Sequence, residues 1–502
     1  MKKIKFLILI ICLTFISFLV YLCFFDDSLF SVDVDFSNLS QNDVFVVGIS
    51  CDNNVAAFDL DAQTYYFSKS TFDLGKLKVI SPYKTKYNVE KVTADKYVID
   101  IYSDKYYQQR YIQILDSNIV LVKSFYDIEK RGYVDVNSLI LYGKKYSDVY
   151  VQVMDNDYLA HNSSPISKYY FGKFRVRGAS SFAAPKKSYK IELNEKVSMF
   201  GMAKDEDWIL DSLYSDKSKI RNKLSSDLWS DINYDQKISN DLDGRFVELF
   251  LNNEYKGAYV LKEKVDKKKT NVSESGLLVK SITHVNDDIR NRFIINNVNL
   301  ADDENDTFLE NYEVKYYSNI SLNRFISMLG DYYYYGDYNS IYRNFDVDNF
   351  LNYKVLVMLI SGEDNLTKNQ YLSLQDSDSK ILITPWDMDL TWGLNWSDSN
   401  NLLSEFSMES SSDINWMNEN ITKSMDEKTL SLMKQRYWEL RKNVITMDTI
   451  NGYLDSYKEL LVNSGAAKRD SERWYEYDVE FEIEQIREWA RRRIEFLDEY
   501  FK

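Results

Sequence analysis

Four oxygen-bearing side chains lie close together in the C-terminal third of the sequence. Asp364 is followed five residues later by Asn369, and Asp387 and Asp389 come shortly afterwards. Carboxylates held near one another repel unless a proton or a divalent cation offsets their charge. Carboxylate and amide oxygens are ligands that suit Mg²⁺ or Mn²⁺ better than Zn²⁺. The four side chains therefore predict a site for a hard divalent cation.

A β-hairpin is the element that would bring these side chains together. Residues 370–374 and 380–384 read as short strands, and the polar segment 375–379 between them has the composition of a turn. Folding this hairpin places Asn369 beside Pro385 at its open end. An Asp and an Asn five residues apart, with a metal-binding Asp after the next strand, is also the layout of protein-kinase catalytic and metal loops.

These residues also have a simpler explanation. The chain contains 77 Asp and Glu residues, so a single Asp at a strand end is more often a turn former or a helix cap. Taken one at a time, the four positions favour a structural role. Taken together on one hairpin, with Trp386, Trp392 and Gly393 around its second half, they favour a metal site.

Composition restricts the classes of function. The length of 502 residues allows two or three domains, and 45% hydrophobic residues indicate packed globular structure. A net charge of −15 argues against nucleic acid as a partner. With His161 and His284 as the two histidines, catalysis by a Ser-His-Asp triad and His-rich zinc sites are all but excluded. Cys12 and Cys23 lie in an apolar N-terminal run, which leaves Cys51 without a partner for a disulfide.

That apolar run predicts a membrane anchor. Three lysines precede residues 6–25, which are long enough to cross a bilayer as a helix. The run ends without the small residues of a cleaved signal peptide, and Asp26 and Asp27 follow it. The charge asymmetry places the N-terminus in the cytoplasm and everything else outside. We therefore expect a single-pass membrane protein that contacts the lipid bilayer through residues 6–25.

The remaining sequence divides into regions of different pattern. After the anchor (1–25) and a polar stalk (26–42), residues 43–136 alternate in the manner of strands and predict a small β-rich domain. A second strand-rich block with one helix covers about 137–265, the expected N-lobe. In the expected C-lobe, about 266–502, helices take over from about residue 322 onward, apart from the predicted hairpin. A strand-rich half followed by a helical half is the order of the two kinase lobes. The predicted fold class is therefore α+β, an atypical protein-kinase-like two-lobed fold.

Several motifs resemble those of the CotH (spore-coat protein H) kinase family, atypical protein kinases of bacterial envelopes and spore coats. The resemblance runs in order from about residue 137 to residue 502, and residues 1–136 fall outside it. Its motifs are Arg177–Ser181 with Pro185–Ile191, Phe200–Trp208, Arg221–Leu224, Glu248–Glu263, Pro385–Asp389 with Gly393, and Arg469–Asp470 with Trp474.

The resemblance implies ATP-dependent phosphorylation of Ser or Thr in a protein substrate. Asp364 would then be the catalytic base, which aligns and deprotonates the substrate hydroxyl. Asn369 and Asp387, together with Asp389, would hold the Mg²⁺ or Mn²⁺ ions that bridge the phosphates. Gly362–Glu363 stands where many kinases have His-Arg, so the usual structural support of the catalytic loop is missing.

The resemblance also implies a lysine that pairs with the ATP phosphates, on the strand after the turn at 177–181. Lys187 is the first candidate and Lys190 the second, because the two face opposite sides of the strand. The turn would offer amides to the phosphates in place of a GxGxxG loop, and a hinge would contact adenine. These further nucleotide contacts are Arg177, Gly178, Ser180, Ser181 and Glu263. Each also has a structural alternative, such as a solvated strand face or an ordinary ion pair.

Two other functions stay open at this level. A pseudokinase-like surface scaffold or adhesion module fits the predicted location, because ATP is scarce outside the cell. A transferase that moves another part of the nucleotide, such as AMP, would use the same metal and phosphate contacts. Retention of every acidic position in the predicted site favours a kinase.

Overall fold

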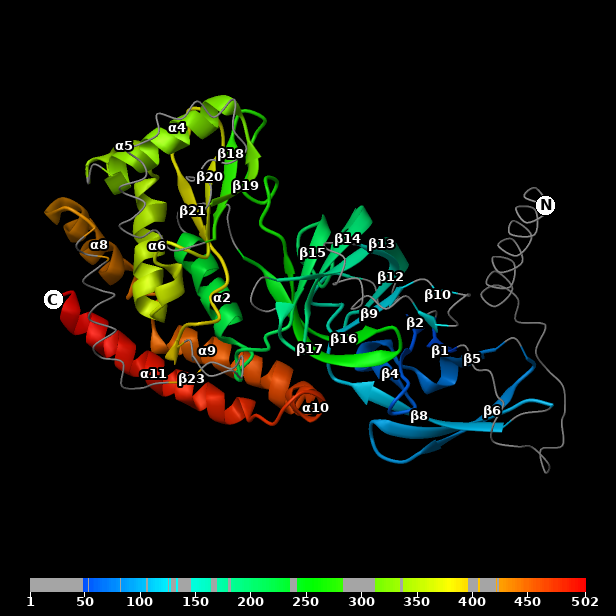
Figure 1. Cartoon of the computed structure of the whole chain (residues 1–502). Coiled ribbons are helices and arrows are strands. Elements are labelled where there is room, and N and C mark those ends of the chain that lie inside the picture. The colour runs from blue at the N-terminus through cyan, green and yellow to red at the C-terminus, as the bar shows by residue number, and fades with distance from the viewer. Residues whose placement is uncertain are drawn as a thin grey trace, which may run out of the picture. The chain divides into compact units, whose positions relative to one another are not determined.

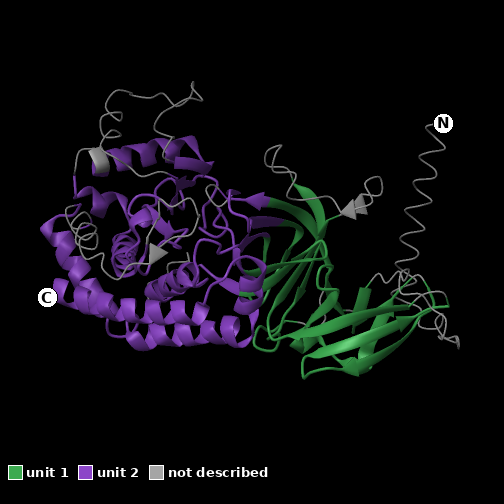
Figure 2. Ribbon diagram, turned by 60° about the horizontal axis from the view of Figure 1, so that its bottom comes forward, with its two compact units in different colours: residues 1–175, 192–206, 246–258 green, residues 176–191, 207–245, 259–502 purple. Residues whose placement is uncertain are grey.

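Two compact units make up the described part of the chain, and its path passes between them several times (Figure 2). Unit 1 comprises residues 1–175, 192–206 and 246–258, and unit 2 comprises residues 176–191, 207–245 and 259–502. The computed structural model describes residues 48–52, 54–81, 83–104, 107–124, 126–127, 132–133, 146–163, 169–178, 182–234, 242–282, 312–334, 337–395, 405–406, 421 and 424–502.

Two sheets of unit 1 lie within the region predicted to be β-rich. The larger has the strand order β3-β4-β8-β7-β6, and the smaller has the order β2-β1-β5. The strands are β1 (Gly48–Cys51), β2 (Asn54–Val55), β3 (Ala57–Asp59), β4 (Thr64–Ser68), β5 (Leu77–Ile80), β6 (Lys86–Lys91), β7 (Lys96–Tyr102) and β8 (Tyr107–Leu115). Alternate residues such as Ile99, Ile101 and Ile112 are fully buried between the sheets, as the alternating pattern requires.

A closed barrel of seven strands follows, in the order β12-β13-β14-β15-β17-β16-β9. Its strands are β9 (Ile119–Ser124), β12 (Ser147–Met154), β13 (Tyr169–Arg177), β14 (Ser188–Val197), β15 (Asp205–Asp211), β16 (Gly244–Leu251) and β17 (Glu254–Glu263). β10 (Tyr126–Asp127) and β11 (Gly132–Tyr133) form a separate pair. Gly172 is required for the approach of β13 to β14, because a Cβ there would lie 2.5 Å from the carbonyl oxygen of Glu192. The boundary between the two units falls within several barrel strands.

Unit 2 also contains a four-stranded sheet, in the order β19-β18-β20-β21. The strands are β18 (Leu277–Ser281), β19 (Tyr312–Tyr317), β20 (Gln370–Leu374) and β21 (Leu382–Pro385), and the two-residue strands β22 (Leu394–Asn395) and β23 (Glu405–Phe406) pair separately. The central helix α6 (Val347–Ile360) packs against β21 and against α2 (Arg221–Tyr234). Asp346 caps the N-terminus of α6, and the left-handed Ser361 ends it.

Unit 2 has further helices besides α2 and α6 (Figure 1). They are α4 (Asn319–Leu329), α5 (Ser340–Asn344), α8 (Glu427–Leu440), α9 (Met447–Lys458), α10 (Ala466–Arg473) and α11 (Val479–Tyr500), with short helical turns at 330–334, 363–365 and 459–463. The apolar stripe predicted for the last helix is confirmed: Ile483, Ile486, Ile494 and Leu497 of α11 are buried. α11 packs along α9 and α6.

The predicted two-lobed kinase-like α+β fold is wrong. The structure is a mixed α/β arrangement in which the central strands close into a barrel, and the strands of the predicted hairpin belong to a further four-stranded sheet. Barrel closure depends on the parallel pairing of β9 with β16, about 130 residues apart in sequence. Local alternation of side chains cannot distinguish such a barrel from an open sheet.

The prediction of a single-pass membrane protein must also be corrected. Within the residues that the structure describes, no helix is both long and apolar enough to cross a bilayer. The prediction relied on the hydropathy of residues 6–25, on the charges that flank them and on the missing cleavage site, and this segment, like the stalk at 26–42, lies outside the described residues.

Candidate functional site

The predicted hairpin is present and its open end is closed by hydrogen bonds. β20 and β21 pair antiparallel with Gln370 opposite Pro385, and the second strand begins at Leu382 instead of Lys380. The backbone N–H of Trp386 donates to the carbonyl oxygen of Asn369 at 2.9 Å. The sequence segments that carry Asn369 and Asp387 therefore meet, as the hairpin prediction requires.

Asn365 fastens the two segments together, and sequence analysis missed this residue. Its buried side-chain amide donates to the carbonyl oxygens of Asn369 at 3.0 Å and of Trp386 at 2.9 Å. Asn369 and Asp387 both have left-handed backbones, with φ of 52° and 57°. Such conformations are costly for residues with a side chain and persist where the surroundings impose them, often at functional sites. Asn365 supplies part of that constraint.

Asp364 and Asn369 lie next to each other. Asp364 sits in the short helical turn at 363–365, and its side chain is 26% exposed. Its Oδ2 accepts from Lys368 Nζ at 2.9 Å and from Asn369 Nδ2 at 3.4 Å. Asp364 and Asn369 are therefore brought together, as the hairpin prediction requires.

Asp387 and Asp389 follow the hairpin in different environments. Asp387 is exposed, whereas Asp389 is half-buried and accepts from Ser215 Oγ at 2.9 Å. Burial, followed by repulsion from Asp387, raises the pKa of Asp389 to about 8. A bound cation would relieve this repulsion, so the donor set fits a divalent metal. In the described part of the chain, no group of three or more His, Cys, Asp or Glu residues is arranged around one ion position.

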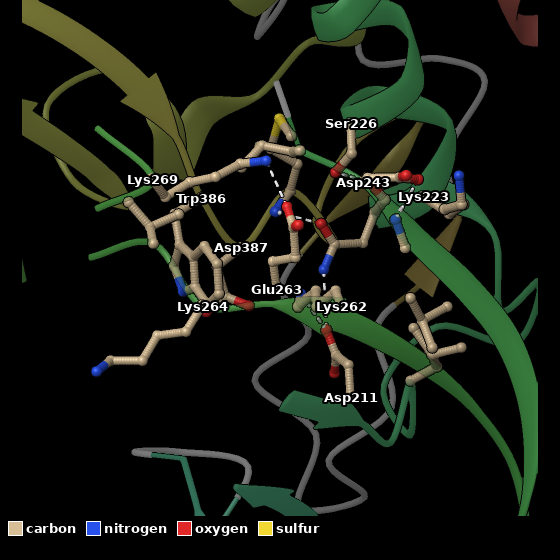
Figure 3. Close-up of a pocket in the computed structure, with 17 residues that line it drawn as sticks. Asp211, Lys223, Ser226, Asp243, Lys262, Glu263, Lys264, Lys269, Trp386 and Asp387 are labelled. Atoms are coloured by element: carbon tan, nitrogen blue, oxygen red, sulfur yellow. Dashed lines mark hydrogen bonds and ion pairs between the residues drawn. The ribbon is translucent and has the colours of Figure 1, made fainter. Parts of the chain in front are cut away.

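A pocket of unit 2 opens beside Asp387 (Figure 3). Its walls are Asp211, Leu213, Asn222, Lys223, Ser226, Leu242, Asp243, Gly244, Val260, Lys262, Glu263, Lys264, Val265, Lys269, Trp386, Asp387 and Met388. Figure 3 shows Lys262 turned toward Asp211 and Lys269 turned toward Glu263, each pair joined as an ion pair. The pocket thus combines apolar walls with charged groups at its edges, as ligand sites commonly do.

Three cationic side chains gather around the indole ring of Trp386, and one of them, Lys262, also lines the pocket. Lys262 Nζ lies 4.6 Å from the ring centre, Arg177 Cζ lies 5.6 Å from it, and Lys280 Nζ lies 5.9 Å from it. Within the residues described, neither Arg177 nor Lys280 has a carboxylate at ion-pair distance. Burial lowers the pKa of Lys280 even though Asp387 attracts its charge. Positive charge concentrated in a partly buried place favours the binding of an anion.

Lys262 has a fixed partner in Asp211. Lys262 Nζ lies 2.6 Å from Asp211 Oδ2, which also accepts from Asn222 Nδ2 at 3.1 Å. Burial alone would raise the pKa of Asp211, but the attraction of Lys262 and Arg177 outweighs it and the pKa is lowered. Asp211 therefore stays ionised and holds Lys262 at the edge of the pocket.

The lysines predicted to contact ATP lie elsewhere. Lys187 Nζ donates to the carbonyl oxygen of Phe182 at 2.7 Å, and Lys190 Nζ pairs with Asp207 at 2.7 Å. Neither lines the pocket, whereas the predicted Glu263 does. 

The turn predicted to hold phosphates is described only in part. Gly178 directly follows β13 and has a φ of 122°, a conformation that glycine adopts readily. Ser180 and Ser181 lie outside the described residues.

Comparison with known families decides the relationship of this chain. A family model described as CotH kinase protein matches residues 174–497, which is more than half of the chain. The chain belongs to the CotH kinase family. The resemblance seen in the sequence is confirmed, and the match includes Arg177, Lys262, Asp364 and Asp387. Membership of the CotH family indicates a kinase-like enzyme. A search of curated proteins found no match to this chain.

Proposed function

We propose that this CotH family member transfers the γ-phosphate of ATP, with Mg²⁺ or Mn²⁺, to a Ser or Thr side chain of a protein. The observation that carries the proposal is the group of three cationic side chains around Trp386, next to Asp387 and the pocket. A triphosphate needs positive charge on one side and a metal site on the other, and these residues supply both.

The nucleotide base would occupy the apolar part of the pocket. The apolar lining comprises Leu213, Leu242, Val260, Val265, Trp386 and Met388. Arg177, Lys262 and Lys280 would then oppose the negative charge of the phosphates. In this arrangement the side chains around Trp386 set the orientation of the triphosphate before reaction.

The metal would be held by Asp387 and Asp389, with Asn369 beside them. When bound, it would neutralise charge on the phosphate oxygens. The contact of Asp389 with Ser215 and the raised pKa of Asp389 support this assignment, because a bound cation would favour the ionised carboxylate.

Asp364 would act on the acceptor hydroxyl. The proton of the Ser or Thr hydroxyl passes to a carboxylate oxygen of Asp364 as the hydroxyl oxygen bonds to the γ-phosphorus and the bond to the ADP oxygen breaks. Lys368 and Asn369 hold the other side of this carboxylate through Oδ2. These contacts would keep Asp364 oriented before transfer.

A labelling experiment with the full chain tests the proposal. We expect transfer from γ-labelled ATP to a dephosphorylated Ser-rich protein, or to the chain itself, in the presence of Mg²⁺ or Mn²⁺. Asp364→Asn should lower turnover by about 100-fold or more while ATP binding is kept, because a base contributes to the chemical step. Asp387→Asn should lose both turnover and metal-dependent ATP binding.

Controls separate the alternatives. Asp378→Asn changes an exposed carboxylate in the turn of the same hairpin and should leave both properties unchanged. Label from α-labelled ATP on the protein would indicate AMP transfer instead. A chain that neither binds MgATP nor transfers label would be a scaffold, and the proposal would be refuted.

A further inference from the structure

The loop that carries Asp387 and Asp389 rests on one segment of unit 2. This support segment, residues 212–220, runs from the end of β15 to the start of α2. Its Ser215 Oγ donates to Asp389 Oδ2 at 2.9 Å. Immediately after it, Asn222 Oδ1 accepts from the backbone N–H of Met388 at 3.3 Å. The position of the candidate metal loop therefore depends on the position of the support segment.

The backbone of the support segment adopts strained conformations. Leu213 and Lys219 have left-handed φ values of 54° and 63°, although neither is a glycine. Asp216, which is 1% exposed, accepts from the backbone N–H of Arg221 at 3.0 Å and from its guanidinium at 2.6 Å. Strained conformations of this kind persist only when several contacts impose them.

Residues near the C-terminus supply those contacts. The hydroxyl of Tyr475 donates to the carbonyl oxygen of Tyr214 at 2.6 Å and accepts from Lys219 Nζ at 2.9 Å. Lys219 Nζ also donates to the carbonyl oxygen of Leu213 at 3.0 Å. One phenol thus connects the two ends of the support segment, and its acceptor residue, Tyr214, directly precedes Ser215.

Buried charges hold the same C-terminal residues in place. Asp470 is fully buried, and accepts from Lys186 Nζ at 2.5 Å and from the hydroxyl of Tyr477 at 2.6 Å. Lys219 Nζ lies 4.0 Å from Asp470 and 4.4 Å from the ring centre of Tyr477. An ion pair in such a place is costly to break, so it fixes the segment that bears Tyr475.

We propose that Tyr475 is a positioning residue for the metal loop, acting through Tyr214 and Lys219 to hold Ser215 against Asp389. The inference rests on the proposed function, because it concerns metal binding at that site. Tyr475 itself contacts neither the pocket lining nor the acidic residues of the loop through any bond described above. Its effect on them is indirect and should appear in metal affinity.

The test measures Mn²⁺ binding directly, from the spectroscopic signal of free Mn²⁺ titrated into the full chain with ATP. Tyr475→Phe should weaken Mn²⁺ binding by about 10-fold, the size of effect seen when a residue that orients a metal ligand is lost. Ser215→Ala should weaken it to a similar extent, because it removes the contact with Asp389 itself. The double variant should lose no more Mn²⁺ affinity than the more affected of the two single variants, because both changes break the same series of contacts.

A matched control distinguishes positioning from general loss of stability. Tyr453→Phe removes a phenol of α9 that donates to Asp231 at 2.7 Å, at the far end of α2 from Asn222. It should lower the melting temperature about as much as Tyr475→Phe while leaving Mn²⁺ binding unchanged. Additive losses in the double variant would overturn the inference, as would unchanged binding in Tyr475→Phe. Absence of Mn²⁺ binding by the wild-type chain would instead refute the proposed function itself, and this inference with it.

Discussion

Replacement of Lys262 by Met should weaken MgATP binding far more than the same replacement of Lys187 or Lys190. Lys262 lies at the pocket beside Trp386, whereas Lys187 is bonded to a backbone carbonyl and Lys190 to Asp207. A hydrogen bond from a charged donor contributes about 1.5–3 kcal/mol, which corresponds to roughly 10- to 150-fold in affinity. We expect a loss in this range for Lys262→Met and less than about threefold for Lys187→Met.

The same change also removes the partner of Asp211, and this second effect must be separated. The side chains of Lys262 and Asp211 are 14% and 18% exposed, so the carboxylate would be left unpaired in a largely buried place. The expected loss of stability is up to about 3 kcal/mol. A double variant, Lys262→Met with Asp211→Asn, removes the unpaired charge. It should recover most of the stability but none of the nucleotide affinity.

Calorimetric titration with MgATP, together with urea denaturation, gives the two quantities for each variant. Recovery of nucleotide affinity in the double variant would show that Lys262→Met weakens binding only by leaving the Asp211 carboxylate unpaired. A loss with Lys187→Met equal to that with Lys262→Met would refute the assignment of the phosphate contact to Lys262. Either result would favour Lys187 or Lys190 as the residue that contacts the ATP phosphates.

Three further outcomes are expected. Asn365→Ala should lower the free energy of unfolding by about 2–4 kcal/mol in urea titrations, because the buried carbonyls of Asn369 and Trp386 lose their donor. A change below about 1 kcal/mol would contradict the role of Asn365 in joining the two segments. MgATP at saturating concentration should raise the melting temperature of the wild-type chain, but not that of Asp387→Asn, and equal shifts would contradict the metal site. Lys354→Met should raise the free energy of unfolding at pH 7 by up to about 3 kcal/mol, because burial lowers the pKa of Lys354 from 10.5 to about 8. The rings of Phe350 and Tyr353 lie near its charge. Because the unfolded chain binds the Lys354 proton more tightly, the destabilisation by Lys354 is fully present below about pH 8 and disappears as pH rises past 10.5. Denaturation at pH 7 and at pH 10 should therefore show a smaller difference in unfolding free energy between wild type and Lys354→Met at the higher pH. An equal difference at both pH values would contradict a lowered pKa for Lys354.

The hairpin was predictable because everything that defines it is local. Two short apolar strands and a polar turn are contiguous in the sequence, and their pairing needs no distant partner. The antiparallel register then determines that Asn369 and Trp386 meet. The terminal helix was predictable for the same reason, since its apolar stripe repeats within one segment.

The barrel and the support segment were not predictable in this way. The barrel closes through a parallel pair between β9 and β16. Tyr475 donates to the carbonyl oxygen of Tyr214, which lies 261 residues earlier in the sequence. Contacts between residues so far apart leave no periodic pattern in either segment. A Tyr beside a charged residue is common in this chain, which has 40 tyrosines, so its type alone indicates nothing.

Lys262, which we propose as a phosphate contact, could not be recognised from local sequence patterns. β17 is buried along nearly its whole length, so its side chains do not alternate between apolar and polar as they would on a half-exposed strand. A lysine in such a strand needs a carboxylate partner, because burying an unpaired charge is costly. That partner is set by register: Ile209 of β15 lies opposite Lys262, which places Asp211 two residues further along the neighbouring strand. Without the strand register, the sequence does not indicate that Lys262 and Asp211 form an ion pair. With it, the pair marks the edge of the pocket, and the three cations around Trp386 follow from the fold.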